Sequence, residues 1–337
     1  MGRKKSILAI GVLVTAASLY FALRGTDFAE IGLSLRRARI ELIPVFLACL
    51  AGFYALKAFR WRRLLQGDCA APPAKTLAGP MMIGFAANNL LPFRLGEIIR
   101  MVVGAKRTSL PQVTILTSIV VERIFDVMAV LTLASVVMWT DVGPIMTHPI
   151  IPYLFVATVA VAFGLFLLAF GSATIFRLLN SLATHNPSRI AGWLLGKAHT
   201  VDAGLQSIRS PKHLSAIILN SIVQWLLLAI TIFLACWSVG VVITVSTAIY
   251  LMLVMTIAIS IPSTPGFIGV IEYSFVLTLG AFGIDAERAL AAAIFYHVIT
   301  WLFVTVIGTV FLHRYSLGWT QLGRSQAVED LATPRDA

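Results

Sequence analysis

The stretch NNLLPFRLGEIIR, residues 88–100, decides how this chain is organised. It follows an apolar run over residues 77–87, at the point where a membrane helix should be ending. Asparagine, proline, arginine and glutamate stand together in it, next to hydrocarbon-soluble sequence. Irregular backbone at membrane depth is tolerated only where it is buried in protein or faces a watery cavity. The short run 77–91 is therefore predicted to be a re-entrant segment rather than an ordinary span.

The composition places almost the whole chain in a membrane. Of 337 residues, 58% are hydrophobic and only 12% are charged, whereas a soluble domain carries about 25% charged residues. The net charge of +11 comes from Lys and Arg that cluster between apolar runs, where they act as topology signals and contacts for anionic headgroups. Nucleic acid is therefore not an expected partner. The three cysteines show no pairing or metal-ligand spacing, so no metal site is expected.

The apolar runs predict an all-α, polytopic membrane protein. A spanning helix needs about 20 mostly apolar residues. Such runs lie at residues 7–23, 42–59, 112–139, 150–170, 214–237, 243–261, 266–283 and 289–312. The first run resembles a signal peptide, but no clear cleavage site follows it, so we interpret it as an uncleaved anchor. We expect about eight membrane-crossing or deeply inserted helices besides the re-entrant hairpin. They form a single transmembrane domain over residues 1–315, followed by a polar cytoplasmic tail at 316–337.

Positive charge indicates which connections face the cytoplasm. It is concentrated at residues 57–75, 94–107 and 171–213. The connections 140–149 and 238–242 contain no Lys or Arg. This bias predicts cytoplasmic termini in an inner membrane, and it requires the run 77–91 to enter and leave on one side. Residues 24–41 should lie on the other side, where apolar residues at helical spacing predict a short interfacial helix.

A second irregular stretch, SIPSTPGFIGVIEY at residues 260–273, breaks another long apolar run. Proline removes a helical hydrogen bond and clashes with the preceding turn. Pro92 and Gly96 in the first stretch have the same spacing as Pro265 and Gly269 in the second. The hinge residues expected from the two breaks are Pro92, Gly96, Pro262, Pro265, Gly266 and Gly269. Together they predict an inverted repeat, with halves at about 42–139 and 214–312, and a substrate site at the midplane between them.

Three charges stand in the middle of the run 112–139. Insertion scales give roughly 2.5–3.5 kcal/mol for each such charge at a helix centre. Glu122 and Asp126 are four residues apart and share a helix face, while Arg123 projects about 100° away. We therefore expect Glu97 or Glu272 from another element to neutralise Arg123. The cluster is a functional candidate, and the alternative is a salt-bridge cluster that only holds helices together.

Charged residues at the two breaks are further candidates. Arg94, Glu97 and Arg100 recur every three residues, which predicts an anion-binding face because guanidinium groups hold phosphate in bidentate fashion. The alternative is a solvated helix end in contact with headgroups. Asn88 and Asn89 are expected to cap this helix or to bind a headgroup.

Glu272 stands alone in an apolar stretch, so we expect it to be paired, titrating or both. Its neighbour Tyr273 is grouped with it as a site candidate. His297 beside Tyr296 is a candidate proton relay, with a satisfied structural histidine as the alternative. Nucleotide-binding and hydrolase motifs are absent from the sequence, so no cofactor and no ATP-driven transport are expected.

Three runs in this order, NNLLPFRLGEIIR, VVERIFDVMAVL and IPSTPGFIGVIEY, resemble the flippase-like lysylphosphatidylglycerol synthase transmembrane family over about residues 5–315. The resemblance implies an α-helical inner-membrane protein that moves a polar lipid between leaflets. The residues that match by motif are Asn89, Pro92, Arg94, Gly96, Glu97, Arg100, Glu122, Arg123, Asp126, Pro262, Pro265, Gly266, Gly269 and Glu272. The soluble aminoacyl-transferring domain of two-part members is missing from this sequence, so synthesis of lysylphosphatidylglycerol is not expected.

We therefore expect a lipid translocator. Its partners would be anionic, aminoacylated, polyprenyl-phosphate or hopanoid-type membrane lipids, and possible association with a lipid-synthesis enzyme is also considered. One alternative is an intramembrane enzyme acting on a lipid-linked phosphate or sugar, with Glu97 or Glu122 as general base and His297 as acid. The other is an accessory subunit of a lipid-pathway synthase, in which the charges are purely structural.

Overall fold

The computed structural model describes residues 2–65, 71–91, 95–140, 210–260 and 264–316, with isolated positions at 156, 160 and 164. Every regular element in these ranges is a helix, which confirms the predicted all-α class. The predicted span 150–170 and the predicted tail beyond Ser316 lie outside the described residues, apart from those isolated positions.

The chain divides into two compact units. The first contains residues 1–53, 79–100 and 226–337, and the second contains residues 54–78 and 101–225. Four helices contribute residues to both units: α3 (Ile43–Leu64), α4 (Ala74–Leu90), α5 (Gly96–Thr108) and α9 (Pro211–Ser238).

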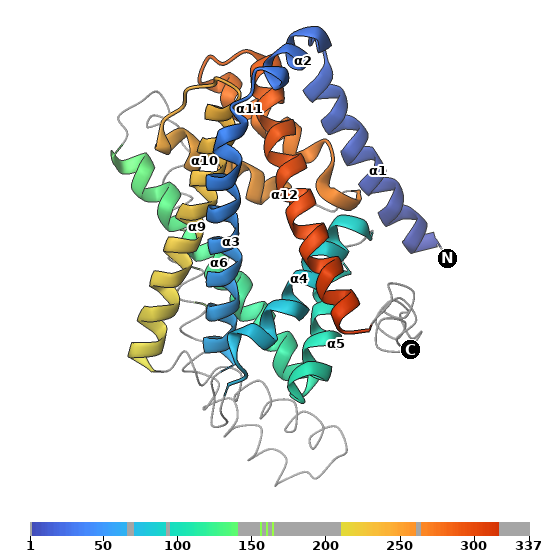
Figure 1. The fold of residues 1–337 in the computed structure, drawn as a ribbon, viewed down its shortest axis with the longest axis vertical. Helices are drawn as coiled ribbons and strands as arrows, with labels where there is room; N and C mark the ends of the chain where they lie inside the picture. Colours follow the sequence, from blue (N-terminus) through green and yellow to red (C-terminus); the bar gives the residue numbers. More distant parts are fainter. Residues whose placement is uncertain are drawn as a thin grey trace. The chain divides into compact units, whose positions relative to one another are not determined.

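The first unit is built around α11 (Val270–Ala281). This helix packs against α1 (Gly2–Leu23), α10 (Val245–Ala258) and α12 (Ala286–Arg314) (Figure 1). Short 3₁₀ turns, η1 (Ile40–Leu42) and η3 (Pro265–Phe267), precede α3 and α11 respectively. The irregular backbone around η3 is the second break predicted from the sequence.

The predicted helix within residues 24–41 is present as α2 (Phe28–Arg36). It begins after Asp27, whose side chain accepts a hydrogen bond from the Ala29 amide and so satisfies a free donor of the first turn. Ile31 is buried against Leu290 and Ala291 of α12. One apolar position therefore anchors a helix whose other residues are mostly exposed or half-buried.

Close helix packing in the first unit depends on glycine. A Cβ at Gly308 of α12 would lie 2.6 Å from the Met82 carbonyl oxygen of α4, and a Cβ at Gly84 of α4 would lie 2.7 Å from the Gly96 carbonyl oxygen. Small residues let helix backbones approach closely where lipid offers no hydrophobic driving force for association. They place α4 directly against both α5 and α12.

The second unit is built on α6 (Gln112–Thr140), the C-terminal half of α3 and the N-terminal half of α9. Its apolar core cluster contains Leu64 of α3, Val121 and Phe125 of α6, and Ile217 of α9. The run predicted to end at residue 59 continues as helix to Leu64. The basic residues that follow Tyr54 are therefore helical, which corrects their assignment to a connection.

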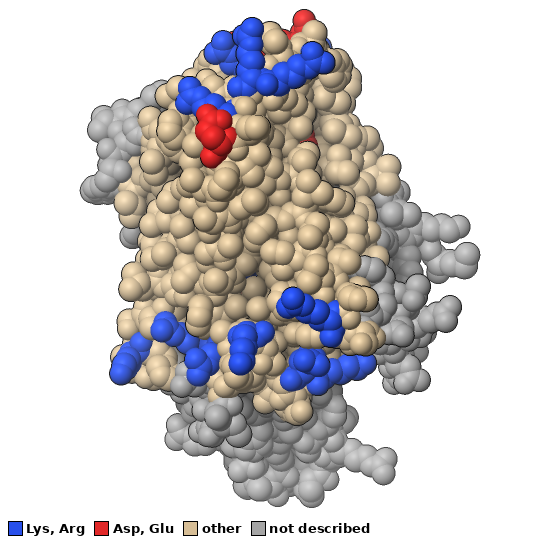
Figure 2. Space-filling model, viewed as in Figure 1, with Lys and Arg blue, Asp and Glu red and all other residues tan. Residues whose placement is uncertain are grey.

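Three helical stretches are long and apolar enough to cross a membrane: Ile40–Leu64, Pro211–Ser238 and Ala286–Arg314. Shorter apolar helices lie at Gly11–Leu23, Val245–Ala258 and Pro265–Ala281. Large apolar side chains such as Leu13, Leu219 and Val306 are well exposed on them. Figure 2 shows one face on which uncharged side chains predominate and Lys and Arg gather in clusters. Such a surface suits contact with lipid.

Candidate functional site

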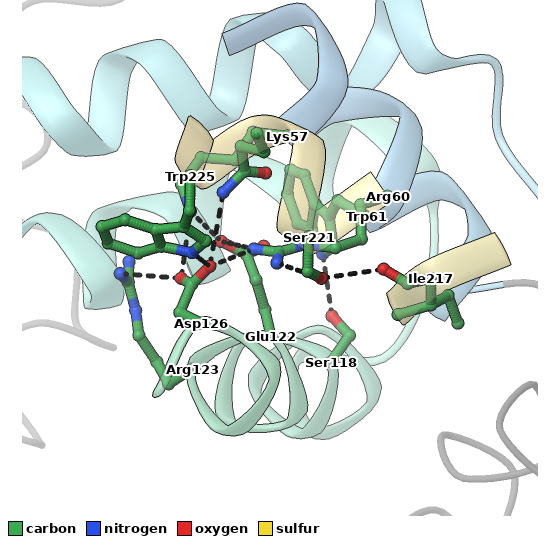
Figure 3. Close-up of polar contacts among 11 residues, drawn as sticks. Lys57, Arg60, Trp61, Ser118, Glu122, Arg123, Asp126, Ile217, Ser221 and Trp225 are labelled. Atoms are coloured by element: carbon green, nitrogen blue, oxygen red, sulfur yellow. Dashed lines mark hydrogen bonds and ion pairs between the residues drawn. The ribbon is translucent and has the colours of Figure 1, made fainter. Parts of the chain in front are cut away.

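Five charged residues of the second unit meet where α3, α6 and α9 come together (Figure 3). We call Lys57, Arg60, Glu122, Arg123 and Asp126 the α6 charge cluster. Four of them are almost completely buried, at 3%, 0%, 0% and 5% exposure for Lys57, Arg60, Glu122 and Asp126. The side chain of Arg123 is 41% exposed.

Asp126 is the central acceptor of the α6 charge cluster. Its Oδ1 lies 2.6 Å from Arg60 Nη2 and 3.0 Å from Trp225 Nε1. Its Oδ2 lies 3.0 Å from Lys57 Nζ and 3.5 Å from Arg123 Nη1. Buried charges are tolerated when they are paired and hydrogen-bonded. Asp126 therefore joins the three helices, because it accepts from cations of α3 and α6 and from the indole N–H of Trp225 on α9.

Glu122 lies one turn before Asp126 on the same face of α6, as their spacing predicts. Its Oε1 is 3.3 Å from Lys57 Nζ and 3.8 Å from Arg60 Nη2. The cations that balance both carboxylates thus come from α3. Arg123 contacts Asp126 on its own helix. Its neutralisation by Glu97 or Glu272 stays a prediction.

Neutral side chains orient the cluster. Arg60 Nη1 donates to Ser221 Oγ at 2.8 Å, and that hydroxyl donates to the Ile217 carbonyl oxygen at 2.8 Å. Trp61 Nε1 donates to Ser118 Oγ at 2.8 Å. These bonds fix α3 against α6 and α9. With three cations and two carboxylates, the α6 charge cluster carries one excess positive charge.

Sequence reasoning missed Lys57 and Arg60 because a basic run after an apolar span is typical of a cytoplasmic connection. A usable signal was present. Lys57, Arg60, Trp61 and Leu64 follow the i, i+3, i+4, i+7 spacing of one helix face, and all four are buried. Phe59 between them is exposed, so the polar side of this turn points inward and the apolar side points outward.

At the first break, Asn88 connects the end of α4 to the start of α5. Its Oδ1 accepts a hydrogen bond from Gly96 N at 2.8 Å, and its Nδ2 lies 3.5 Å from Glu97 Oε2. This confirms the predicted capping role for Asn88. Asn89 instead contacts α12, where its Nδ2 donates to Thr305 Oγ1 at 3.1 Å.

The remaining candidates of the first break are only partly described. Arg100 is buried, at 1% exposure, and Glu97 is half-buried. Pro92 and Arg94 lie outside the described residues. The predicted anion-binding face of Arg94, Glu97 and Arg100 therefore stays a prediction.

At the second break, two glycines adopt conformations that other residues avoid. Gly266 in η3 has φ 75°, and Gly269 just before α11 has φ 81°. Pro265 opens η3, while Pro262 lies outside the described residues. These φ values lie in the left-handed region, where a Cβ would be strained. The glycines and proline of this stretch therefore account locally for the interruption of the helix.

Glu272 and His297 form a buried pair beside this break. Glu272 Oε2 accepts from Gly269 N at 2.6 Å, and Oε1 lies 2.6 Å from His297 Nδ1. His297 Nε2 lies 2.7 Å from the Gly266 carbonyl oxygen. The expectation that Glu272 is paired is confirmed. Tyr273 packs its ring against Phe21 of α1, with centroids 5.9 Å apart.

The two breaks lie next to each other within the first unit. A Cβ at Gly266 would lie 3.4 Å from the Asn89 carbonyl oxygen and 3.2 Å from Trp301 Nε1. On the other side, Thr264 Oγ1 is 2.9 Å from Thr15 Oγ1 of α1. The structure thus brings together the end of α4 and the turn before α11, which are far apart in sequence. Among the described residues, no group of three or more His, Cys, Asp or Glu is placed to hold a metal ion.

Comparison with known proteins places the chain among membrane proteins. A UPF0104 membrane protein of Methanocaldococcus jannaschii is 22% identical over 226 residues, which cover 67% of this chain and 92% of that protein. Glycosyltransferase AglD of Haloferax volcanii is 28% identical over 136 residues, covering 40% of this chain and 22% of that protein. No solved structure gives a significant match. The family model described as the lysylphosphatidylglycerol synthase TM region matches residues 8–308, and the chain belongs to this family.

Proposed function

We propose that this protein is a lipid translocator that moves a phosphate-bearing lipid between the leaflets of a bacterial inner membrane without ATP. The observation that carries the proposal is the α6 charge cluster, which holds one excess positive charge where α3, α6 and α9 meet, with four of its five residues buried. Charges inside a membrane protein are expensive and mark substrate or ion pathways. An anionic headgroup is the ligand that this excess charge would attract.

Arg123 is the member of the cluster that supports direct headgroup contact. Its side chain is 41% exposed, whereas Lys57 and Arg60 are enclosed by the two carboxylates. A guanidinium group binds phosphate through two parallel hydrogen bonds and stays charged at all relevant pH values. The buried residues would then hold Arg123 and Asp126 in place while the headgroup passes.

The two breaks support movement rather than static binding. The two breaks would lie on hairpins that enter from opposite faces, one in each half of an inverted repeat at about 42–139 and 214–312. About eight membrane helices would accompany the re-entrant hairpin. Broken helices near the midplane are the usual sites of gating in secondary transporters. The proximity of Gly266 to the Asn89 carbonyl supports a shared gate between the two breaks.

The test is headgroup accessibility in liposomes that contain the purified full chain. Fluorescent phosphatidylglycerol, lysyl-phosphatidylglycerol, phosphatidylethanolamine and a polyprenyl phosphate are each loaded on one leaflet and chemically quenched from outside. We expect protein-dependent transfer of at least one anionic lipid, and at least a tenfold slower rate with Arg123→Gln. Arg62→Gln is the matched control, because Arg62 is an exposed arginine only two residues after the buried Arg60. Failure of every lipid class, or full activity of Arg123→Gln, would contradict the proposal.

A second candidate rests on the partial similarity to a glycosyltransferase. In this alternative the chain acts on a lipid-linked sugar or phosphate, or supports an enzyme that does. The burial of Glu122 between Lys57 and Arg60 argues against it as general base, since a base must reach the proton it abstracts. A mass shift in a lipid extract incubated with pure protein would favour this alternative over translocation.

A further inference from the structure

We propose that Glu272 and His297 form a one-proton binding site that latches the second break, and that lipid translocation is coupled to this proton. The proton site stands by itself, and only its coupling to lipid movement rests on the proposed function. The site links three elements: Glu272 at the start of α11, His297 in the middle of α12, and the Gly266 carbonyl in the turn between α10 and α11.

The contacts of this site require one proton more than a carboxylate and a neutral imidazole supply. The Gly266 carbonyl can only accept a hydrogen bond, so the 2.7 Å contact requires a hydrogen on His297 Nε2. The 2.6 Å contact between Nδ1 and Glu272 Oε1 requires a second hydrogen between those atoms, since two lone pairs would repel. A carboxylate and a neutral imidazole together hold one hydrogen. The closed pair therefore holds one proton more, whichever atom carries it.

Loss of that proton would release the break. The neutral ring has one N–H, so it can serve either Glu272 or the Gly266 carbonyl, and the other contact then sets two acceptors against each other. Glu272 Oε2 also accepts from Gly269 N, so both glycines with positive φ in this break are held by the pair. Deprotonation would free the turn at Gly266 while α11 stays capped by Glu272.

Other formal charges are distant along the helices that pack here. Residues 11–23 of α1, α10, and residues 79–90 of α4 contain no Asp, Glu, Lys, Arg or His. On α12 the nearest charged residues are Glu287 and Arg288, about 15 Å toward its start, where Glu287 accepts from Asp27 N before α2. Tyr296 and Tyr273 are the neighbouring ionisable groups, and their rings pack against Phe46 and Phe21. Within these described segments of α1, α4, α10 and α12, no other formal charge lies near the pair.

Hydrogen exchange of the full-length protein in detergent tests the site without any lipid substrate. Exchange of peptides covering residues 264–281 is measured from about pH 5.5 to 8.5, the range in which histidine commonly titrates, and is corrected for the intrinsic rate. We expect protection to fall as pH rises, by up to about tenfold per pH unit, the limit for release of one proton. His297→Gln and Glu272→Gln should abolish this dependence, and His313→Gln, exposed at the end of the same helix, should retain it.

Two outcomes would overturn the proton site: pH-independent protection of this segment in the unmodified protein, or a normal pH response in His297→Gln. The coupling of lipid translocation to this proton is tested in liposomes with an imposed pH gradient at constant ionic strength. A lipid flux that does not respond to the gradient overturns the coupling. A pH-dependent latch in a protein that moves no lipid supports the proton site and contradicts the proposed function, so the two failures are distinguishable.

Discussion

The buried charge of one residue, Asp126, is compensated by several donors. One carboxylate accepts from Arg60, Lys57 and Trp225 at 2.6 to 3.0 Å, while only 5% of the residue is exposed. Replacing such a pair by apolar residues can be neutral, but removing one partner leaves an uncompensated buried charge. Removing one charged member of the cluster is therefore expected to lower stability far more than replacing both members of an ion pair by apolar residues.

Asp126→Asn is accordingly expected to destabilise the protein strongly. The amide keeps the size of the side chain but removes the charge that balances Lys57 and Arg60, and breaking a buried pair in this way costs about 3 to 5 kcal/mol. The free energy of unfolding in mixed micelles is the measurement. Glu30→Gln on the exposed face of α2 is the control and should change stability by no more than about 0.5 kcal/mol. Equal effects of the two variants would contradict the structural role of Asp126.

At the scale of elements, the hairpin of α4 and α5 is held by backbone proximity rather than by large side chains. Gly84 faces Gly96 across the hairpin, and Gly308 of α12 faces Met82 and Ala86 of α4. The side chain of Asn88 then closes the turn by accepting from the first amide of α5. The predicted re-entrant segment would need such close packing, because lipid cannot satisfy the backbone groups at its ends.

Gly84→Ala is predicted to destabilise the hairpin. Its Cβ would lie 2.7 Å from the Gly96 carbonyl oxygen and 2.8 Å from Arg100 Cβ, and overpacking of this kind costs about 1 to 3 kcal/mol. Gly280→Ala in α11 is the matched control, since nothing lies within 4 Å of the added methyl group there. That change should be neutral or stabilising by up to about 1 kcal/mol through helix propensity. Thermal unfolding of both variants in detergent compares them, and a Gly84→Ala variant as stable as Gly280→Ala would rule out the close approach.

For the whole molecule, the distribution of Lys and Arg predicts a sidedness that chemical labelling can check. Glu41 just before α3 and Arg63 in its last turn are both exposed. The charge bias puts Arg63 on the cytoplasmic side and Glu41 on the opposite side. In a variant whose three native cysteines are serine, Glu41→Cys should react with an impermeant maleimide in intact cells, and Arg63→Cys only after lysis. Labelling of both positions in intact cells would show that the predicted orientation is wrong.

The helices of the molecule were largely readable from the sequence, and the partners of the charged residues were not. The helix α6 covers Gln112–Thr140 against a predicted 112–139, and α12 covers Ala286–Arg314 against 289–312. By contrast, the end of α3 was misplaced, because its last turns carry charges that burial and pairing made compatible with a helix. The spacing of apolar residues indicates which face of a helix is buried, but it does not identify the other helix that supplies a counter-ion.

The sequence by itself determined that the chain is an all-α membrane protein, that two proline- and glycine-rich stretches interrupt its helices, and that α6 carries charges at its centre. These follow from hydrophobicity, from backbone restrictions and from the cost of charge in lipid, all of which are local properties. Only the tertiary structure decided that Lys57 and Arg60 neutralise Glu122 and Asp126, and that His297 bridges Glu272 to the Gly266 carbonyl. Pairing depends on which helix faces are brought within a few ångströms, and packing of the whole chain sets those distances.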